Sequence, residues 1–450
     1  MQKIDNLKES KEEVCAKSKN LLIHEGYSIS ELKKIEYGLQ FRVTKDDSDI
    51  GILRIYESTK RGKSCIDPSL INKNSEWEII RNMLINELKN NKIPEITKTL
   101  TYKSIKQAPD ALKQILEHES ELEEIANKIK ILNPKKIYFA GSGSSFNVAE
   151  YGELLFHQFV KIPAAAKTSL DYVHYTEGIG LDTVTVVISV SGSKGDATAI
   201  ARKAKENGSY IIAITNTPES ELVEISDNYF IIPSGTTESF INTTEYIAQL
   251  FAIAVLVKHL SGSDSENFRD FESEIYKLPG KIEDSFKHEP KIKKAAEREK
   301  DRDVFVFSGK GPSKIVADQT ALKLRETAWK IKHSESIAID EIPHGRLFAL
   351  GDEKTLFILM LSHETTKDKV DRVSNLIHKM GAKIVALCDE NYNFKEQLTV
   401  SKTHEYLFPI LVQPISYLWV CYMNHIRNLN IDEPRNVAMI DKFLKEKEEC

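Results

Sequence analysis

Two serine- and glycine-rich segments have the composition of phosphate-binding loops. Each follows a run with strand character and precedes a predicted helix: AGSGSS at 140–145 and ISVSGSK at 188–194. Glycine lets the backbone approach a ligand closely, and the first turn of a helix offers unpaired N–H groups to an anion. Hydroxyl groups beside one ammonium group suit a dianionic phosphate monoester. The candidate phosphate-binding residues are Ser144, Ser145, Ser189, Ser191, Ser193 and Lys194.

Neither segment matches a nucleotide-binding motif. The pattern GxxxxGK[ST] is absent, and Phe146 stands where the dinucleotide fingerprint has its third glycine. A small phosphorylated metabolite is therefore a better candidate ligand than a nucleotide. Taken alone, each segment could also be a tight turn with a capping serine and no ligand.

Three further segments carry groups for proton transfer or ligand contact. Lys323 and Glu326 share one face of a predicted helix, where Glu326 is either a general base or half of a surface ion pair. His344 lies in the loop DEIPHGR, from which it reaches a ligand or another subunit, or is a plain loop histidine. Thr243 and Thr244 either cap the helix that follows them or also reach the ligand.

The composition excludes several classes of function. Lys and Arg number 62 against 67 Asp and Glu, a net charge of -5, which argues against a general nucleic-acid binder. Five cysteines without a CxxC pair indicate reduced thiols and a cytoplasmic protein. The start of the chain is polar, and the longest apolar run covers only residues 247–257, so we predict neither secretion nor a membrane span. We expect no metal and no other cofactor.

The elements that must position these groups divide the chain into five predicted parts. Residues 1–90 form a small α+β module of unknown role, with a helix at 12–24, strands at 34–43 and 51–56, and a helix at 77–88. Residues 91–132 hold a linker and a helix at 109–131. The polar pattern that predicts the linker begins slightly earlier and covers 89–106. The remaining parts are an α/β domain at 133–262, a helical connector at 263–300 and a second α/β domain at 301–450 with a C-terminal tail.

Both larger domains alternate strands with helices, which predicts mostly parallel sheets flanked by helices. The first domain has predicted strands at 136–140, 184–189, 210–215 and 229–233, a further candidate strand at 164–169, and helices at 145–160, 195–206 and 245–260. The second has predicted strands at 304–308, 355–361, 383–388 and 406–410, and helices at 314–330, 367–380 and 414–425. The predicted fold class is α/β with two tandem domains.

Five segments in this order resemble the isomerase half of glucosamine-6-phosphate synthase, a double SIS (sugar isomerase) domain. GSSFN at 143–147 is similar to the family's GTSYN, and SVSGSK at 189–194 to its phosphate loop SQSGET. ALKLRE at 321–326 resembles ALKLKE, EIPHG at 341–345 resembles ELKHG, and EPRNVA at 433–438 resembles PRNLA. The resemblance covers about residues 105–442.

This resemblance implies a site for fructose 6-phosphate and glucosamine 6-phosphate. Ser145, Ser189, Ser191 and Thr244 match positions that hold phosphate or sugar. Glu326 matches the base that moves a proton between C1 and C2, and Lys323 matches a supporting lysine. His344 matches a ring-opening histidine that the family takes from the partner subunit, which implies a homodimer.

The sequence also departs from the family. Gln2 follows Met1 where the glutamine-hydrolysing domain has a cysteine, so we expect a glutamine-independent enzyme. Met439 stands where the family has a Schiff-base lysine, with Lys442 three residues on, and a thioether cannot form an imine. We expect interconversion of an amino-sugar phosphate and a keto-sugar phosphate. The alternatives are a non-catalytic sugar-phosphate sensor and a plain aldose–ketose phosphate isomerase.

Overall fold

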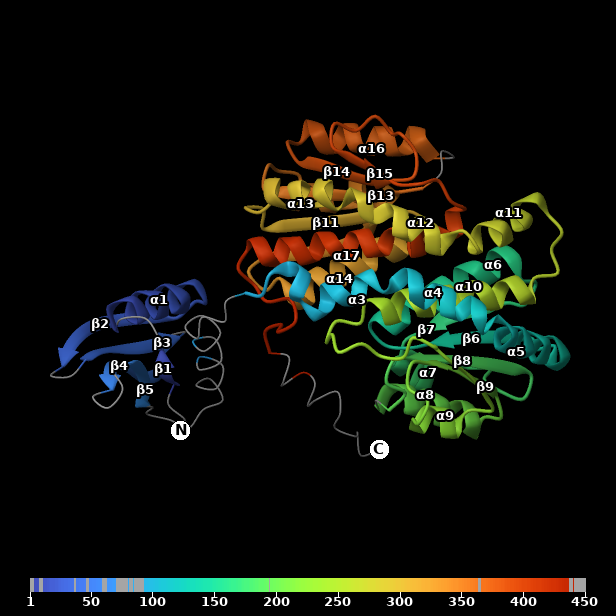
Figure 1. Cartoon of the computed structure of the whole chain (residues 1–450), viewed down its shortest axis with the longest axis horizontal. Coiled ribbons are helices and arrows are strands. Elements are labelled where there is room, and N and C mark those ends of the chain that lie inside the picture. The colour runs from blue at the N-terminus through green and yellow to red at the C-terminus, as the bar shows by residue number, and fades with distance from the viewer. Residues whose placement is uncertain are drawn as a thin grey trace. The chain divides into compact units, whose positions relative to one another are not determined.

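The structure is a computed structural model. It describes the chain apart from residues 1–3, 8–10, 36–37, 46–47, 59–62, 70–79, 81–83, 85–92, 194, 363–365, 437–439 and 441–450. Internal contacts divide the chain into two compact units, Met1–Pro94 and Glu95–Cys450 (Figure 1).

The N-terminal unit combines a helix with an antiparallel sheet of order β1-β5-β4-β3-β2. Its elements are β1 (Ile4–Leu7), α1 (Lys11–His24), β2 (Ser28–Ile35), β3 (Gly38–Lys45), β4 (Ser48–Ser58) and β5 (Lys63–Ser69). Alternate residues of β3 and β4 are buried because successive side chains of a strand point to opposite faces. They are Phe41, Val43, Leu53 and Ile55.

The structure corrects one prediction for this unit. The single strand predicted at 34–43 is wrong, because β2 ends at Ile35 and β3 begins at Gly38, and these two residues pair across an antiparallel hairpin. Gly38 was the turn signal inside the apparent run. The helix predicted at 77–88 lies outside the described residues, except for Ile80 and Leu84, which are helical and buried.

The second unit opens with helices where a linker was predicted. They are η1 (Ile96–Lys98), α3 (Leu100–Lys106), α4 (Ala108–Glu117) and α5 (Glu119–Leu132). The distant Asp432 caps α3, accepting hydrogen bonds from the Leu100 and Thr101 N–H groups at 2.7 and 2.9 Å. The single helix predicted at 109–131 is two helices, which His118 separates at φ -106° and ψ 20°.

The first large sheet is parallel, with the order β10-β9-β8-β6-β7. Its strands are β6 (Lys136–Ala140), β7 (Ala164–Lys167), β8 (Thr183–Ser189), β9 (Tyr210–Thr215) and β10 (Asn228–Ile231). Its helices are α6 (Ser144–Phe159), α7 (Ser169–Tyr175), α8 (Gly195–Glu206), α9 (Glu221–Ile225) and α10 (Thr244–Leu260). Every residue of β8 is buried, because α7, α8 and α9 cover one face of the sheet and α5, α6 and α10 cover the other.

The second large sheet repeats this arrangement, with the order β12-β11-β13-β14-β15. Its strands are β11 (Val304–Gly309), β12 (His333–Ala338), β13 (Thr355–Leu361), β14 (Lys383–Cys388) and β15 (Gln397–Thr399). Its helices are α14 (Pro312–Thr327), η3 (Ile339–His344), α15 (Arg346–Leu350), α16 (Lys367–Lys379), η5 (Glu405–Leu407) and α17 (Phe408–Ile426). The connector between the two sheets is helical: α11 (Glu266–Ile275), α12 (Leu278–Ser285), η2 (Phe286–His288) and α13 (Glu289–Arg298).

The second sheet contains two elements that the sequence analysis placed wrongly. The strand predicted at 406–410 is instead η5 and the start of α17, and β15 forms the sheet edge. Strand β12 was missed because its sequence, HSESIA, is mostly polar. The predicted fold class, parallel α/β sheets flanked by helices with a small N-terminal α+β module, is confirmed.

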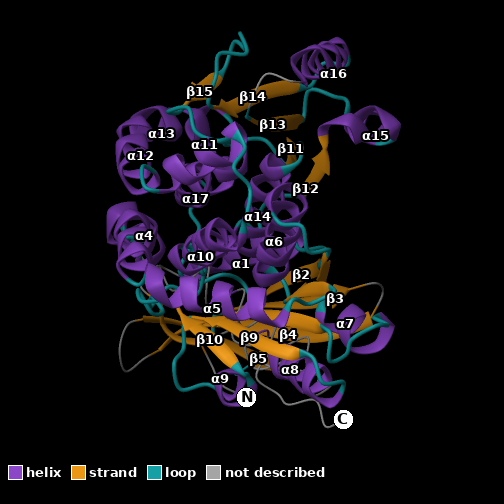
Figure 2. Cartoon of the chain, turned by 90° about the vertical axis from the view of Figure 1, so that its right-hand side faces the viewer, coloured by secondary structure: helices purple, strands orange, loops and turns teal. Residues whose placement is uncertain are grey.

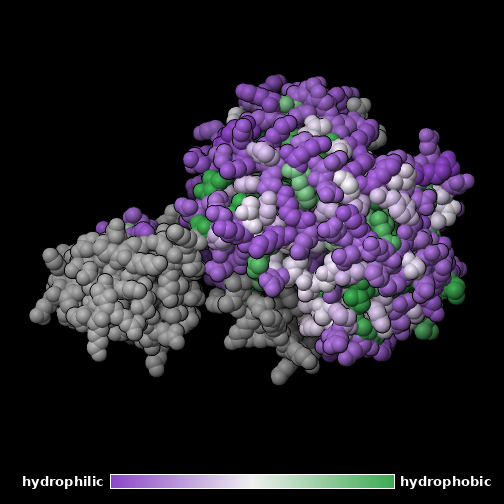
Figure 3. Space-filling model, in the orientation of Figure 1, coloured by the Kyte–Doolittle hydropathy of each residue, from purple (hydrophilic) through white to green (hydrophobic). Residues whose placement is uncertain are grey.

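Four helices, α6, α10, α14 and α17, lie between the two parallel sheets and join them in one apolar core (Figure 2). In α10 every residue from Thr244 to Lys258 is buried, including the apolar run at 247–257. The segment Glu405–Ile426 is long and apolar enough to span a bilayer, but 89% of its most apolar window is buried inside the protein. On the face seen in Figure 3, the described surface is mostly hydrophilic, with hydrophobic residues in small separate groups.

One carboxylate ties α3, α13 and α17 together. Glu289 accepts hydrogen bonds from Lys106 (2.6 Å), Tyr422 (2.7 Å) and Tyr102 (3.1 Å). Burial by itself opposes ionisation, but these three donors outweigh it and hold the pKa of Glu289 below its ordinary value. A carboxyl with a lowered pKa stabilises the fold above its unfolded-state pKa and loses that contribution as the pH falls through the folded value.

We therefore expect Glu289→Gln to lower the free energy of unfolding at pH 7 by about 1.5–3 kcal/mol. The difference from the wild type should begin to shrink near pH ~4.3, the unfolded-state pKa, and shrink further as the pH falls through the lower folded-state pKa. Urea unfolding at pH 7 and at about pH 3 measures both effects. Glu297→Gln, an exposed residue of the same helix, is the control, and an equal loss in both variants contradicts the prediction.

Candidate functional site

The turn from β6 into α6 brings Ser144 and Ser145 to the carboxyl end of the first sheet. Gly141 is required there, because a Cβ at this position would lie 2.8 Å from the backbone of Ser145. Gly143 takes a φ of +57°, which favours glycine, and begins the helix. The hydroxyl groups of Ser144 and Ser145 are therefore in the first turn of α6, where both residues are partly exposed.

The loop after β8 is anchored to its neighbours. Ser189, the last residue of β8, accepts a hydrogen bond from the Gly192 N–H at 3.1 Å. The Val190 carbonyl oxygen accepts three hydrogen bonds from the segment after β9, donated by the Asn216 N–H and the hydroxyls of Thr215 and Thr217. This anchoring leaves Ser191 and Ser193 partly or fully exposed on the loop, while Lys194 lies outside the described residues.

These two loops lie side by side in the fold. Strands β6 and β8 are parallel neighbours, so their carboxyl ends meet at the same edge of the sheet. The chain leaves β6 toward β7 on one side and returns to β8 on the other, which makes this a topological switch point. Ligands of open α/β sheets bind at such points. The structure therefore brings the predicted phosphate-binding serines together.

Helix α14 presents one polar face to this edge. Gln319, Lys323 and Glu326 are spaced i, i+4 and i+7, so they share that face. Gln319 Nε2 donates to Ser144 Oγ at 3.0 Å, which joins α14 to the first turn of α6. Seven residues at 1.5 Å each put Glu326 about 10 Å along the helix from this contact.

Lys323 and Glu326 form the ion pair that their spacing allowed, with Nζ 2.8 Å from Oε2. The Lys323 side chain is 6% exposed, whereas that of Glu326 is 35% exposed. The buried ammonium group therefore fixes the orientation of a carboxylate that solvent and ligands can still reach. A general base needs both an ionised carboxylate and access to the proton it removes.

The sequence analysis missed a buried polar group behind this face. Gln319 Nε2 also donates to the Tyr417 hydroxyl at 2.9 Å. Burial raises the pKa of Tyr417 well above its ordinary value, and the nearby Glu326 and Glu245 raise it further, so the phenol stays neutral. Glu245 is 1% exposed and accepts a hydrogen bond from the Thr237 N–H through Oε1, while its Oε2 has no hydrogen-bond partner among the described residues. The i, i+4 spacing of Gln319 and Lys323 was the sequence signal from which Gln319 could have been found.

Two predicted site residues, Thr244 and His344, form no hydrogen bond with the groups described above. Thr244 is 2% exposed and donates a hydrogen bond to the Ser104 carbonyl oxygen of α3, so its side chain faces the interior. His344 ends η3 at an exposed position and makes no hydrogen bond or ion pair with another described residue. Met439 lies outside the described residues. Among the residues that are described, no group of three or more His, Cys, Asp or Glu is arranged to hold a metal ion.

The loop after β8 is closely packed at Gly192, so a substitution there tests whether its backbone is tightly held. Gly192 has a φ of +58°, and a Cβ there would overlap the Ser220 hydroxyl and lie 2.7 Å from its Cβ. We expect Gly192→Ala to lower the free energy of unfolding by about 1–3 kcal/mol, through backbone strain and steric overlap. Gly195→Ala is the matched control, because nothing lies within 4 Å of its added Cβ. Denaturant unfolding measures both, and an unchanged Gly192→Ala would show that the loop is not tightly held.

Comparison with known proteins assigns this fold. The model of the SIS domain matches residues 130–259. Glutamine–fructose-6-phosphate aminotransferase [isomerizing] from Clostridium tetani is 27% identical over 314 residues, which cover 67% of this chain and 51% of that enzyme. The chain thus spans about half the length of the curated relatives it matches.

Solved structures show the same architecture. The C-terminal domain of the glucosamine-fructose-6-phosphate aminotransferase from Francisella tularensis superimposes with a TM-score of 0.68 at 20% identity, covering 75% of this chain and 98% of that one. A glucosamine-6-phosphate deaminase from Thermotoga maritima gives a TM-score of 0.57 at 20% identity, covering 72% of this chain and 97% of that one. The chain therefore contains a SIS domain at residues 130–259, and it is a homologue of the isomerase half of the glutamine–fructose-6-phosphate aminotransferases.

Proposed function

We propose that this phosphosugar-isomerase relative interconverts an amino-sugar phosphate and a keto-sugar phosphate, of the glucosamine 6-phosphate and fructose 6-phosphate type. The observation that carries the proposal is the hydrogen bond between Gln319 and Ser144. It holds the polar face of α14 against the first turn of α6, with Glu326 about 10 Å further along the helix. This separation is comparable with the length of an extended six-carbon sugar phosphate.

The serine loops would hold the phosphate end. Ser145 on α6, Ser189 at the end of β8, and Ser191 and Ser193 after it offer hydroxyl donors at one sheet edge. The first turn of α6 favours an anion there. Lys194 would add a positive charge. Thr244 is left out of this proposal, because its hydroxyl is already hydrogen-bonded to α3.

Glu326 would act on the carbon end as the general base, oriented by Lys323. In the open-chain amino aldose it removes the proton from C2 and returns it to C1, while a proton passes from the nitrogen to O1. The C2 amine thereby becomes an imine, which water hydrolyses to the ketone and ammonia. This direction forms the imine from the substrate's own amine, so it requires neither glutamine nor a lysine at position 439.

His344 would come from a second subunit. It is exposed, and Phe348, four residues on in the adjoining helix α15, is 89% exposed. Phe348 is therefore available to pack against a second chain, close in sequence to His344, which makes no hydrogen bond with another described residue. We infer a homodimer in which His344 opens the sugar ring at the partner's site.

A non-catalytic sugar-phosphate sensor is the second candidate. The observation that favours it is Met439, which cannot form the imine that a lysine would form at this position. Both candidates bind a sugar phosphate at the same serines and differ only in whether Glu326 moves a proton. Binding and turnover must therefore be measured separately.

Binding is tested by ligand-induced stabilisation. A ligand that binds only the folded state at a hundredfold excess over Kd adds about 2.7 kcal/mol, so fructose 6-phosphate should raise the Tm. We expect Ser189→Ala combined with Ser191→Ala to remove most of this rise, because both hydroxyls are lost from one loop. Ser263→Ala, on the exposed connector, should keep it, and unphosphorylated fructose should not produce it. A full rise in the double variant would place the phosphate elsewhere.

The proton transfer is tested at Glu326. General-base catalysis contributes about 10²–10⁴-fold, so Glu326→Gln should lose that much in kcat on glucosamine 6-phosphate while the Tm rise persists. In D₂O the wild type should place deuterium at C1 of the product. Glu283→Gln, an exposed residue of α12, is the control. Binding of the sugar phosphate without turnover or exchange in the wild type would instead identify the sensor.

Mixed dimers test whether the site is shared between subunits. Glu326→Gln and His344→Ala should each be inactive alone. If His344 acts on the partner's site, a mixed dimer has one intact site, so random mixing restores about a quarter of wild-type activity. If both residues act within one chain, each site of the mixed dimer lacks one of them and activity is not restored. Light scattering checks that dimers form.

A further inference from the structure

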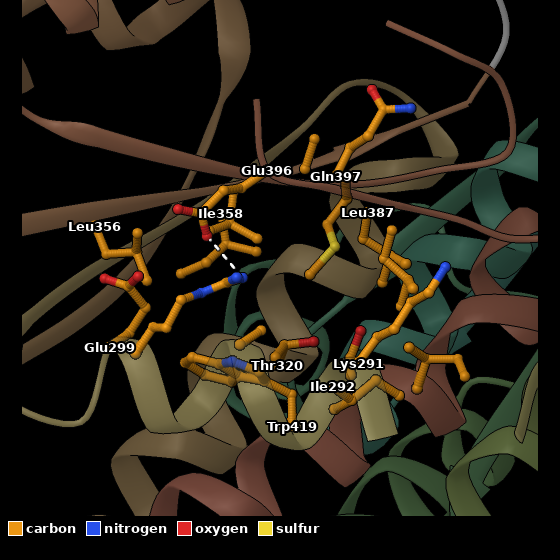
Figure 4. Close-up of a pocket in the computed structure, with 18 of the residues that line it drawn as sticks. Lys291, Ile292, Glu299, Thr320, Leu356, Ile358, Leu387, Glu396, Gln397 and Trp419 are labelled. Atoms are coloured by element: carbon orange, nitrogen blue, oxygen red, sulfur yellow. Dashed lines mark ion pairs between the residues drawn. The ribbon is translucent and has the colours of Figure 1, made fainter. Parts of the chain in front are cut away.

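A pocket of about 310 Å³ lies in the second sheet domain, away from the serine loops of the first (Figure 4). Strands β11, β13 and β14 form its floor, and helices α13 and α17 form its walls. Most of its lining is apolar, including Phe307, Leu356, Ile358, Met360, Leu387 and Trp419.

An apolar pocket of this size is unusual in a protein interior. Side chains in cores interdigitate with few voids larger than a water molecule. This pocket is at the lower end of the range of about 300–1,000 Å³ that holds small organic ligands, and it is about twice the size of a core cavity of roughly 150 Å³ that binds benzene. Its volume and lining suit the apolar body of a small molecule.

The rim of the pocket carries an excess of positive charge. Lys291, Lys294 and Arg298 are spaced i, i+3 and i+7 on α13, so they share the face that lines the pocket, and Lys395, shortly before β15, also lines it. The two carboxylates at the pocket are already paired. Glu299 pairs with Lys383 and Arg302. Glu396 pairs with Lys383 and with Arg298, and both of these distances are 2.8 Å. Figure 4 draws the pair of Glu396 with Arg298 as a dashed line.

The three lysines at the rim are not neutralised in this way. Lys291, Lys294 and Lys395 are exposed, and none forms an ion pair with another described residue. An apolar cavity below a cluster of uncompensated ammonium groups is complementary to a molecule with an apolar tail and a negative head. We propose that this pocket binds a small amphipathic anion, with its acyl tail among the apolar residues and its carboxylate at Lys291 and Lys294.

Decanoate, used below its micelle concentration, is the probe, and isothermal titration calorimetry of the full chain measures its binding. We expect saturable binding of decanoate, weak or no binding of acetate, which lacks the tail, and weaker binding of decyltrimethylammonium, whose head is positive. Equal affinity for the anionic and cationic heads, or no saturable binding of decanoate, overturns the proposal.

Variants locate the site. Ala295→Phe, at a partly buried position of the lining, should fill the pocket and abolish binding. Lys291→Gln with Lys294→Gln should weaken binding about fivefold, since exposed ion pairs contribute little each. Lys287→Gln with Lys293→Gln makes the same charge change at exposed positions that do not line the pocket, and it should have no effect. The lysine variants are at the surface, so their folding is not at risk, and equal weakening by both pairs contradicts a site at this rim.

Discussion

The side-chain amide of Gln319 connects the two sheet domains at the point where the candidate site is built. It is fully buried and donates to Ser144 on α6 and to Tyr417 on α17. A buried amide that loses its partners costs free energy, so these two hydrogen bonds favour the rotation of α14 that the structure shows. That rotation determines where Lys323 and Glu326 lie. The candidate base therefore depends on a contact between domains rather than on its own helix.

The same four central helices serve both sheets. Helices α10 and α17 are buried along almost their whole length, so they supply the apolar core that holds the sheets together. Helix α14 has different neighbours on different faces: its polar residues face the serine loops, whereas Thr320 lines the pocket of the second domain. Apolar burial thus fixes the arrangement of the domains, and a few polar contacts within it position the functional groups.

In the proposed function, the site has two ends. The phosphate end is local, because a glycine-permitted turn and a helix start are encoded within a few residues. The carbon end is not local, because it needs a carboxylate from the second domain and, in our proposal, a histidine from a second subunit. Solved structures with this fold include the C-terminal domain of a glucosamine-fructose-6-phosphate aminotransferase and a glucosamine-6-phosphate deaminase.

Elements whose signal is local in the chain could be predicted from the sequence. Strands β9, β13 and β14 have the predicted bounds, because buried parallel strands are short apolar runs between turns, and the serine loops follow their strands as expected. Other features could not be predicted, because they depend on residues far apart in the chain. Gln319 and Ser144 are 175 positions apart, and the cap of α3 comes from Asp432, 332 positions from Leu100. Strand β12 forms despite a polar sequence because β11 supplies its hydrogen bonds. Thr244 faces inward because the Ser104 carbonyl oxygen accepts a hydrogen bond from its hydroxyl. Propensity and spacing report only on neighbours in sequence, whereas burial and hydrogen-bond partners are set by whatever the fold brings alongside.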